Sequence, residues 1–264
     1  MTNTDLHKPD FDEEAFVPSA YNRTYYAEVM EDERCLIRWQ ASELDGTIRG
    51  HLAKLGIRRF SSHFDVGSGP TVHHLLALEK YSDAIDLADY LPENLEEIRR
   101  WVSGRGLGVH DWTPFVRAIL AAENVPVTDA QIIARETSVR GKIRSFNTLD
   151  LKAPTRGMAR YTAPFVTSFF VADSATGEKH TFAAMTKTAF RLVASNGLFV
   201  AAYLGGCEEY NVGGRWLRSA NLNQADIECA LAKSGAKDIR LQRFDTPTLA
   251  SEGFDHIFAV TAIA

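Results

Sequence analysis

The sequence lacks the features that direct a chain to a membrane or to nucleic acid. No apolar run approaches the ~20 residues of a membrane-spanning helix. The N-terminal stretch is polar and acidic, without the apolar segment of a secretory leader. The net charge is −5 over 264 residues, so nothing favours electrostatic capture of nucleic acid or of an anionic surface. We therefore expect neither nucleic-acid nor membrane partners.

Cysteine is also scarce. The three cysteines, Cys35, Cys207 and Cys229, are far apart and odd in number, and none belongs to a C-x-x-C pair. This excludes a disulfide framework and predicts a reduced, cytoplasmic setting. We expect no metal site.

The length and the ordinary composition, with 45% hydrophobic and 24% charged residues, suit a globular enzyme-sized domain. Residues 1–14 are expected to be mobile. We divide the rest into an N-terminal helical lid or cap within 1–56 and an integrated core at 57–264. No linker, repeat or low-complexity segment separates the two. A monomer or a weak homo-oligomer is expected.

One stretch departs from an ordinary strand–helix pattern. A buried strand at His63–Val66 runs into Gly67 and Gly69, which permit a tight turn with no Cβ to obstruct a ligand. A helix follows from Val72, and its first N–H groups face outward. The next apolar strand ends in Asp89, whose carboxylate suits the hydroxyls of a ribose. The pattern is typical of a nucleotide-binding half of an α/β fold; the alternative is a plain turn and an incidental surface aspartate.

Strand and helix signals alternate to the C-terminus. Further strands are expected at 84–88, 142–147, 165–172, 198–204, 237–244 and 256–262, the last two close enough to pair antiparallel. Helices are expected at 16–30, 34–56, 72–80, 92–102, 115–122, 127–137, 179–193 and 223–234, with a loop or hairpin at 205–219. The result is an α/β, Rossmann-like fold. It has a seven-stranded, mostly parallel sheet, helices on both faces, an antiparallel C-terminal strand pair and an N-terminal helical lid.

The strand ends indicate which nucleotide binds. Val72 occupies the position of the third glycine in a dinucleotide site, which disfavours NAD and an oxidoreductase. No G-x-x-x-x-G-K-[ST] sequence is present, so there is no P-loop. An adenosine ligand without phosphates fits better, with its ribose on Asp89 and its adenine near Asp150 and Leu151. These features resemble the class I S-adenosylmethionine-dependent methyltransferases.

Two segments narrow this resemblance. Asp65–Thr71, with the sequence DVGSGPT, is similar to the signature of the NNMT/PNMT/TEMT family, which contains nicotinamide, phenylethanolamine and thioether or indolethylamine methyltransferases. Phe16–Tyr26 is similar to the family's F-x-P-x-x-Y-L-x-x-Y-Y segment, with Asn22 in place of the leucine. The similarity continues more loosely to the C-terminus and is poor at 123–140.

The resemblance implies a site for S-adenosyl-L-methionine, with S-adenosyl-L-homocysteine as product. The cofactor-binding residues that it implies are Tyr21, Tyr26, Gly67, Ser68, Gly69, Thr71, Asp89, Tyr90, Asn94, Asp150 and Leu151. The residues expected to orient the acceptor are Tyr21, Asp173 and Glu208, and those expected to contact it are Tyr203, Glu209 and Tyr210. Tyr203 stands where the family carries an acid at the end of the fifth strand. From the residues alone, the tyrosine helix could equally be a lid or part of the core.

We therefore predict a methyltransferase that methylates a nitrogen of a small polar acceptor, such as an amine, an amino acid or a guanidine. The nearest alternative is an S-methyltransferase acting on a thioether, which needs no base. A more remote alternative is a non-catalytic module that binds an adenosyl ligand. An O-acceptor usually calls for a metal or a histidine base. The adjacent histidines His73 and His74 point in different directions on a helix, so a packing role is the better prediction for them.

Overall fold

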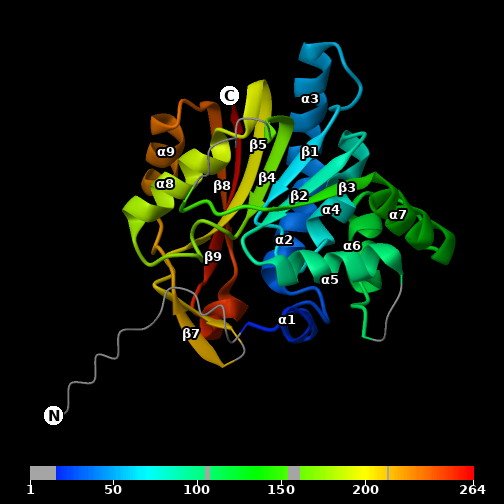
Figure 1. Cartoon of the computed structure of the whole chain (residues 1–264), viewed down its shortest axis with the longest axis horizontal. Helices are drawn as coiled ribbons and strands as arrows, with labels where there is room; N and C mark the ends of the chain where they lie inside the picture. Colours follow the sequence, from blue (N-terminus) through cyan, green and yellow to red (C-terminus); the bar gives the residue numbers. More distant parts are fainter. Residues whose placement is uncertain (1–15, 105–107, 154–160, 213) are drawn as a thin grey trace.

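The computed structural model describes residues 16–104, 108–153, 161–212 and 214–264. The expected mobility of residues 1–14 concerns residues outside these ranges. The described residues form a seven-stranded sheet with helices on both faces (Figure 1). The fold class predicted from the sequence is confirmed. Among the residues described, no helix is long and apolar enough to cross a membrane.

The strand order in the sheet is β3-β2-β1-β4-β5-β9-β8. The strands are β1 (His63–Val66), β2 (Ile85–Asp89), β3 (Ile143–Thr148), β4 (Ala163–Phe169), β5 (Val193–Gly205), β8 (Lys237–Asp245) and β9 (His256–Ile263). β1 to β5 pair in parallel, and β9 runs antiparallel between β5 and β8. The strand order reverses beside β1, and ligands of open α/β sheets bind beyond the carboxyl ends of the strands at such a place.

A separate apolar core lies on each face of the sheet. One core joins α4 (His73–Leu78), α5 (Pro92–Ser103), α6 (Thr113–Ala122) and the N-terminal helices to the sheet. The other joins α8 (Lys179–Phe190) and α9 (Gln224–Lys233) to the opposite face. Figure 1 shows α8 and α9 to the left of the sheet and α4 to α7 to the right. Because the parallel strands are covered on both faces, β1 is buried at every position, including the polar residues His63 and Asp65.

The N-terminal region contains three helices rather than the expected two. They are α1 (Pro18–Tyr25), α2 (Glu31–Trp39) and α3 (Asp45–Leu55), with a π-helical turn between α2 and α3. Leu36, Ile37 and Trp39 bury the apolar stripe of α2 in the same core as α4 and α6. α3 ends at Gly56, whose φ of 68° is the left-handed cap conformation that glycine favours. The start of α2, which precedes this stripe, is therefore held rigidly over the sheet.

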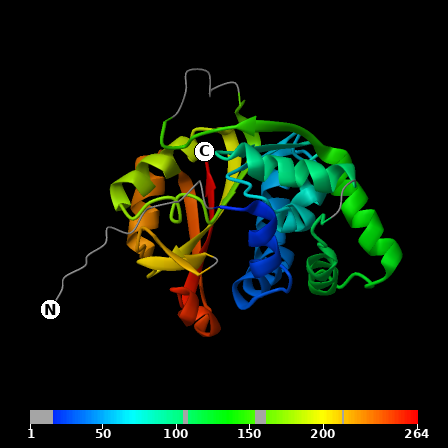
Figure 2. The same ribbon diagram turned by 60° about the horizontal axis from the view of Figure 1, so that its bottom comes forward.

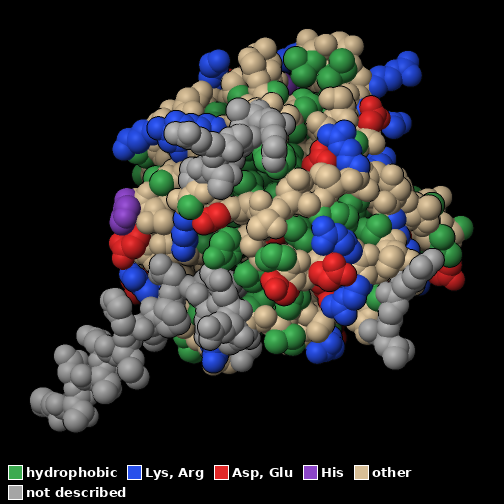
Figure 3. All heavy atoms as spheres, in the orientation of Figure 1, with side chains coloured by type: hydrophobic (Ala, Val, Ile, Leu, Met, Phe, Trp, Pro, Cys, Tyr) green, Lys and Arg blue, Asp and Glu red, His purple; other side chains and the backbone are tan. Residues whose placement is uncertain are grey.

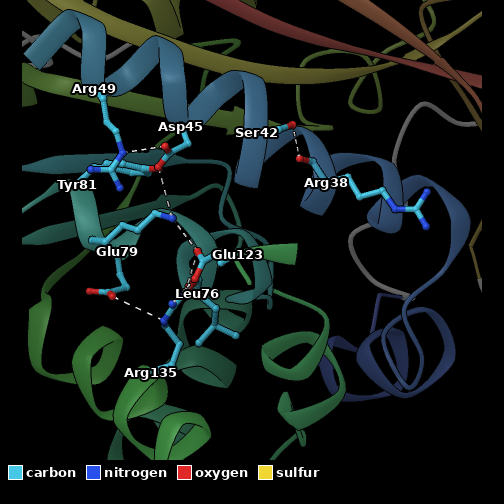
Figure 4. Close-up of polar contacts among 10 residues, drawn as sticks. Arg38, Ser42, Asp45, Arg49, Leu76, Glu79, Tyr81, Glu123 and Arg135 are labelled. Carbon is cyan, nitrogen blue, oxygen red and sulfur yellow. Dashed lines mark hydrogen bonds and ion pairs between the residues drawn. The ribbon is translucent and has the colours of Figure 1, made fainter. Parts of the chain in front are cut away.

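A network of charged side chains fastens α7 (Asp129–Lys142), in the region that resembles the family poorly, to the core (Figure 4). The Arg135 guanidinium lies 2.5 Å from a Glu123 carboxylate oxygen and donates to the Leu76 carbonyl at 2.7 Å. The Lys80 ammonium pairs with the same glutamate at 2.7 Å. These side chains are largely buried, so each charge needs its partner. The network fixes α7 without adding residues to the end of the sheet where the strands finish.

Two strands differ from their predicted bounds by more than two residues. β4 ends at Phe169 instead of Ala172, because Phe170 has a φ of 55° and leaves the extended conformation. β5 begins before the turn expected at Asn196, whose φ of 59° makes an irregularity inside the strand rather than its start. The first difference matters for function, since Phe170 and Val171 then lie beyond the strand end.

On the face drawn in Figure 3, acidic and basic side chains of the described residues lie interspersed, in keeping with the modest net charge.

Candidate functional site

A cavity of about 390 Å³ lies at the end of the sheet where the parallel strands finish. Figure 1 shows α1 and the hairpin of β6 (Glu209–Val212) and β7 (Arg215–Arg218) at this end of the molecule, and Figure 2 turns this end forward. The Tyr25 hydroxyl of α1 donates to the Asn211 carbonyl of the hairpin at 3.1 Å. The cavity walls come from α1, the start of α2, the strand ends, the hairpin and the 3-10 turn η4 (Pro247–Glu252).

The glycine turn after β1 forms one wall of the cavity. Gly67 and Gly69 have φ values of 73° and 58°, the left-handed region that glycine enters without strain. The Gly67 and Ser68 N–H groups donate to the Ala88 carbonyl at 2.7 and 3.0 Å, which ties the turn to the end of β2. The Thr71 hydroxyl donates to the Ser68 carbonyl at 3.1 Å. Gly67 and Gly69 line the cavity, whereas Ser68 and Thr71 are buried behind it and shape the turn.

Asp89 is the last residue of β2 and faces the cavity. Its Oδ2 accepts from the Gly69 N–H at 2.8 Å, and its Oδ1 accepts from the Leu91 N–H at 2.8 Å and the Asn94 amide at 2.9 Å. A carboxylate offers about four lone-pair positions, so these bonds leave one of them, on Oδ2, unfilled. Burial raises the pKa of Asp89, and the three donors favour its charged form. The carboxylate is rigidly aimed and retains acceptor capacity toward the cavity.

The residues expected beside the adenosine also lie together in the cavity wall. The residues that line the cavity here, on the β2 and β3 side of the sheet, are Tyr90, Asn94, Asp150 and Leu151. Sequence reasoning missed Leu91, Leu149 and Met185, which extend the apolar wall. Leu149 follows the end of β3, and its N–H donates to the Asp89 carbonyl at 2.9 Å. This bond fixes the position of Asp150 relative to Asp89.

The tyrosines of α1 cover the cavity from above the turn. Tyr21 and Tyr26 hydrogen bond through their hydroxyls, and their ring centroids lie 5.6 Å apart. The Tyr26 ring stacks on the His73 ring at 4.8 Å and so docks α1 on α4. Burial raises the pKa of Tyr21 to about 12, so both phenols stay protonated at neutral pH. α1 is thus a lid. Its tyrosine rings close one side of the cavity, and the hydroxyl ends of these side chains lie inside the cavity.

Two carboxylates at the start of α2 line the cavity next to this lid. Burial and, to a smaller extent, the neighbouring Glu33 together raise the pKa of Asp32 to about 7. Glu33 is buried and lies 3.1 Å from His73 Nε2. Sequence reasoning missed both residues, because acids in the first turn of a helix usually face solvent and compensate the helix dipole. Only the packing of α2 over the sheet turns them inward.

Comparisons with known proteins identify the family of this chain. A model of the NNMT/PNMT/TEMT family matches residues 5–261. The chain belongs to the NNMT/PNMT/TEMT family. Indolethylamine N-methyltransferase of Mus musculus is 24% identical over 239 residues, which are 86% of this chain and 84% of that protein. Phenylethanolamine N-methyltransferase of Sus scrofa is 23% identical over 199 residues, which are 73% of this chain and 68% of that protein.

Solved structures support the fold. The N-methyltransferase NodS from Bradyrhizobium japonicum WM9, in complex with S-adenosyl-L-homocysteine, has a TM-score of 0.50 to this protein. The similarity covers 93% of this chain and 94% of NodS at 9% sequence identity. At that identity it concerns the arrangement of the elements and not the residues of the site.

Asn22, the departure from the NNMT/PNMT/TEMT pattern in the lid, has a structural role here. Its side chain is completely buried, and its amide donates to the Pro70 carbonyl at 2.9 Å. The bond joins α1 directly to the glycine turn. A leucine could not make it, so this chain fastens its lid with a hydrogen bond at the position where the family pattern has leucine.

The histidine pair is buried in packing contacts, as the sequence predicted. His73 pairs with Glu33, and His74 Nε2 lies 2.9 Å from Asp65 Oδ1. The two rings are nearly perpendicular, at 85°. Burial alone would raise the pKa of Asp65, but His74, His63 and the Thr167 hydroxyl lower it to about 2. These groups stabilise β1 beneath the turn, and neither His73 nor His74 lines the cavity.

The residues expected on the acceptor side divide into two groups. Tyr210 lines the cavity, and its hydroxyl donates to the Ser174 carbonyl at 2.8 Å. Asp173 and Tyr203 are buried away from the cavity, Tyr203 packing edge-on against Phe182. The remaining two acids, Glu208 and Glu209, lie at the base of the hairpin and outside the cavity wall, Glu208 being exposed and accepting from the Asn221 amide at 3.0 Å.

Asp173 instead joins two strand ends. Its Oδ2 accepts from the Leu204 N–H at 2.8 Å, and its backbone carbonyl accepts from the Ser219 hydroxyl and the Ala220 N–H. Burial raises the pKa of Asp173 to about 7, because only a few donors offset the lost hydration. The geometry is that of a buried connector between the end of β4, the end of β5 and the hairpin.

Asp173→Asn is expected to stabilise the protein more at high pH than at low pH. The folded-state pKa of about 7 lies above the usual value of 3.8, so the native protein holds a proton that the unfolded chain has released. The Asp173 contribution to stability therefore falls as pH rises from about 4 to about 7. Asparagine keeps an oxygen for the Leu204 N–H and carries no charge.

Urea unfolding of both proteins at about pH 5 and about pH 8 measures this difference. The wild type should lose more stability than Asp173→Asn between the two pH values. The exposed Glu28→Gln serves as the control and should follow the wild type. An equal loss in Asp173→Asn and in the wild type would contradict the assignment of a buried, raised-pKa carboxyl.

Proposed function

We propose that the protein transfers the methyl group of S-adenosyl-L-methionine to a nitrogen atom of a small polar acceptor, such as an amine, an amino acid or a guanidine. The supporting observation is one cavity that combines the glycine turn, the Asp89 carboxylate and a buried tyrosine lid in a member of the NNMT/PNMT/TEMT family. The relatives that the chain matches are named N-methyltransferases, which supports nitrogen as the accepting atom.

The residues present fit this cofactor. A Cβ built on Gly69 would have no other atom within 4 Å, so open space lies beside the turn. Asp89 offers its unfilled acceptor position next to that space, where a ribose hydroxyl can donate. Leu151 lies on the adenosine side, and Tyr21 and Tyr26 lie over the turn, where they would cover the methionine part.

Bound S-adenosyl-L-methionine supplies an activated methyl group on a positively charged sulfur. The protein needs to do little covalent chemistry, so its contribution is geometry and exclusion of water. The lid closes one side of the cavity through the Tyr25–Asn211 and Asn22–Pro70 hydrogen bonds. Phe170 and Val171, beyond the end of β4, form part of the wall between the turn and the hairpin. The acceptor nitrogen must be held there with its lone pair free of a proton.

Two measurements test the proposal. Calorimetry with S-adenosyl-L-homocysteine should show stoichiometric binding, and a methyl-transfer assay should show turnover with members of a panel of amines, amino acids, guanidines and thioethers. Binding without turnover on any acceptor would indicate a non-catalytic adenosyl-ligand module. Turnover confined to thioethers would replace N-methylation by S-methylation. Failure to bind the homocysteine product would contradict the proposal as a whole.

A further inference from the structure

The described residues that line the cavity carry more negative than positive charge. Their charged members are Asp32, Glu33, Asp89, Asp150 and Glu252, against Lys152. These acids lie on two sides of the sheet. Asp89 ends β2 and Asp150 follows β3, and both strands lie on one side of β1. Glu252 ends η4, which precedes β9 on the other side. The cavity therefore has acids at two ends, and only one end is explained by the adenosine ligand.

Asp32 belongs to the second end. The preceding residue, Glu31, accepts a hydrogen bond from the Thr248 N–H at 3.0 Å, which fixes the start of α2 beside η4. Leu249 and Phe254, from η4 and the segment that follows it, line the cavity together with Asp32. Asp32 thus lines the cavity beside η4, on the β9 side of the sheet, whereas Asp89 lies at the end of β2.

The two acids of α2 that line the cavity differ in their partners among the described residues. Glu33 has His73 within ion-pair distance, at 3.1 Å. Asp32 forms no ion pair with a described basic side chain, and its buried Oδ1 has no hydrogen-bond partner there. A buried carboxylate without a cation is costly, and proteins retain such groups at binding sites. The Asp32 oxygen therefore has capacity for a donor that comes from a ligand.

Aromatic rings accompany this carboxylate. Tyr21 and Phe254 line the cavity with Asp32, and the face of an aromatic ring attracts a cation. An anion would be repelled here, and a neutral polar group would gain little from the rings. A carboxylate with aromatic walls favours a small molecule that carries a cationic nitrogen on an apolar body.

We propose that Asp32, supported by Glu33, binds the amino group of the methyl acceptor and selects cationic amines over uncharged analogues. This inference rests on the proposed function, because it places the acceptor in the part of the cavity that the cofactor leaves free. It assigns acceptor recognition to α2 and not to the acids predicted at the strand end and in the hairpin. The charged Asp32 carboxylate accepts from the N–H groups of the ammonium form, which must release one proton, to water or to this carboxylate, before its nitrogen lone pair can take the methyl group.

The test measures binding to the protein–S-adenosyl-L-homocysteine complex by calorimetry. The probes are 2-phenylethylamine and indolethylamine, each paired with the alcohol of the same carbon skeleton. Because the amine gains one charged hydrogen bond to Asp32, the wild type should bind at least one amine about 30-fold more tightly than the alcohol of the same skeleton. In Asp32→Asn the amine affinity should fall about 30-fold and the preference for the amine should disappear. Glu28→Gln, an exposed acid in the segment between α1 and α2, is the control and should match the wild type.

The affinity for S-adenosyl-L-homocysteine alone reports folding and separates the two proposals. It should stay within about 2-fold in Asp32→Asn, since Asp32 lies beside η4 and Asp89 at the end of β2. An equal fall in both affinities would place Asp32 at the cofactor and overturn the inference. An unchanged amine preference in Asp32→Asn, or no amine binding by the wild-type complex, would also overturn it. If the wild type did not bind the homocysteine product at all, the proposed function itself would fail.

Discussion

Asp89→Ala is expected to weaken S-adenosyl-L-methionine binding by about 100-fold, the largest loss that we predict for a binding residue. A hydrogen bond from a ribose hydroxyl to the unfilled position of this charged acceptor contributes up to about 3 kcal/mol, which corresponds to about 100-fold. The carboxylate also holds its own surroundings, because it accepts from the Gly69 and Leu91 N–H groups and from the Asn94 amide. Its removal therefore takes away the ligand contact and loosens the turn.

Two further variants separate these contributions. Asp89→Asn keeps the shape but must direct its NH₂ group at the Gly69 N–H or at the donors around Oδ1, so a donor faces a donor. It should lose most of the affinity that alanine loses. Asn94→Ala removes one of the donors that hold Asp89 and leaves the carboxylate, so it should cost only about 5-fold.

Calorimetry with S-adenosyl-L-methionine and thermal unfolding of the free proteins provide the measurements. A stability loss of about 1–2 kcal/mol is expected for Asp89→Ala, from the lost turn and helix contacts. Affinity should fall by more than this loss of stability explains. If turnover collapsed while affinity for the cofactor and its product stayed unchanged, Asp89 would not bind the ribose.

The glycine turn and Asp89 could be predicted from the sequence because local chemistry fixes them. The positive φ values at positions 67 and 69 favour glycine there. An acid at the end of the next strand commonly binds the hydroxyls of a ribose in such folds. The tyrosine lid followed from a family resemblance and not from periodicity. Periodicity alone left a core helix and a lid equally open.

The acceptor side could not be predicted in the same way. Asp173 follows the end of β4, but the side chain turns inward to the Leu204 N–H instead of outward to the cavity. Asp32 looks like an ordinary acid in the first turn of a helix, yet the docking of α2 beside η4 aims it at the cavity. Both outcomes depend on contacts between residues far apart in the chain. Spacing along the sequence carries no information about them.

Gly67→Ala is expected to destabilise the protein by about 3–4 kcal/mol, enough to remove much of the stability of a typical domain. The φ of 73° costs an alanine about 1 kcal/mol. The larger part comes from the new Cβ, which would lie 2.3 Å from Val171 Cγ2 and 2.9 Å from Val171 Cβ. Overpacking typically costs 1–3 kcal/mol, and we expect the upper part of this range, about 2–3 kcal/mol, because both Cγ atoms and the Cβ of Val171 lie within clash distance of the new Cβ.

Gly69→Ala is the matched control, because Gly69 lies in the same turn and also has a positive φ. Its φ of 58° imposes similar backbone strain, but a Cβ there would meet no other atom within 4 Å. Urea unfolding should therefore show a loss of about 1 kcal/mol for Gly69→Ala against about 3–4 kcal/mol for Gly67→Ala. Cofactor affinity should show the reverse order once folding is corrected for, since the new methyl group of Gly69→Ala points into the open space beside Asp89.

The contact with Val171 can be tested by removing its side chain. Gly67→Ala combined with Val171→Ala deletes both Cγ atoms, at 2.3 and 2.5 Å from the new Cβ, but keeps the Val171 Cβ at 2.9 Å. The double variant should recover about half of the clash energy, measured as a coupling in a double-mutant cycle. No coupling, or equal losses in Gly67→Ala and Gly69→Ala, would show that backbone strain alone sets the need for glycine. A double variant that loses less stability than the sum of the single variants would show that the glycine turn packs against the segment after β4. Val171 would then set how closely that segment approaches the turn.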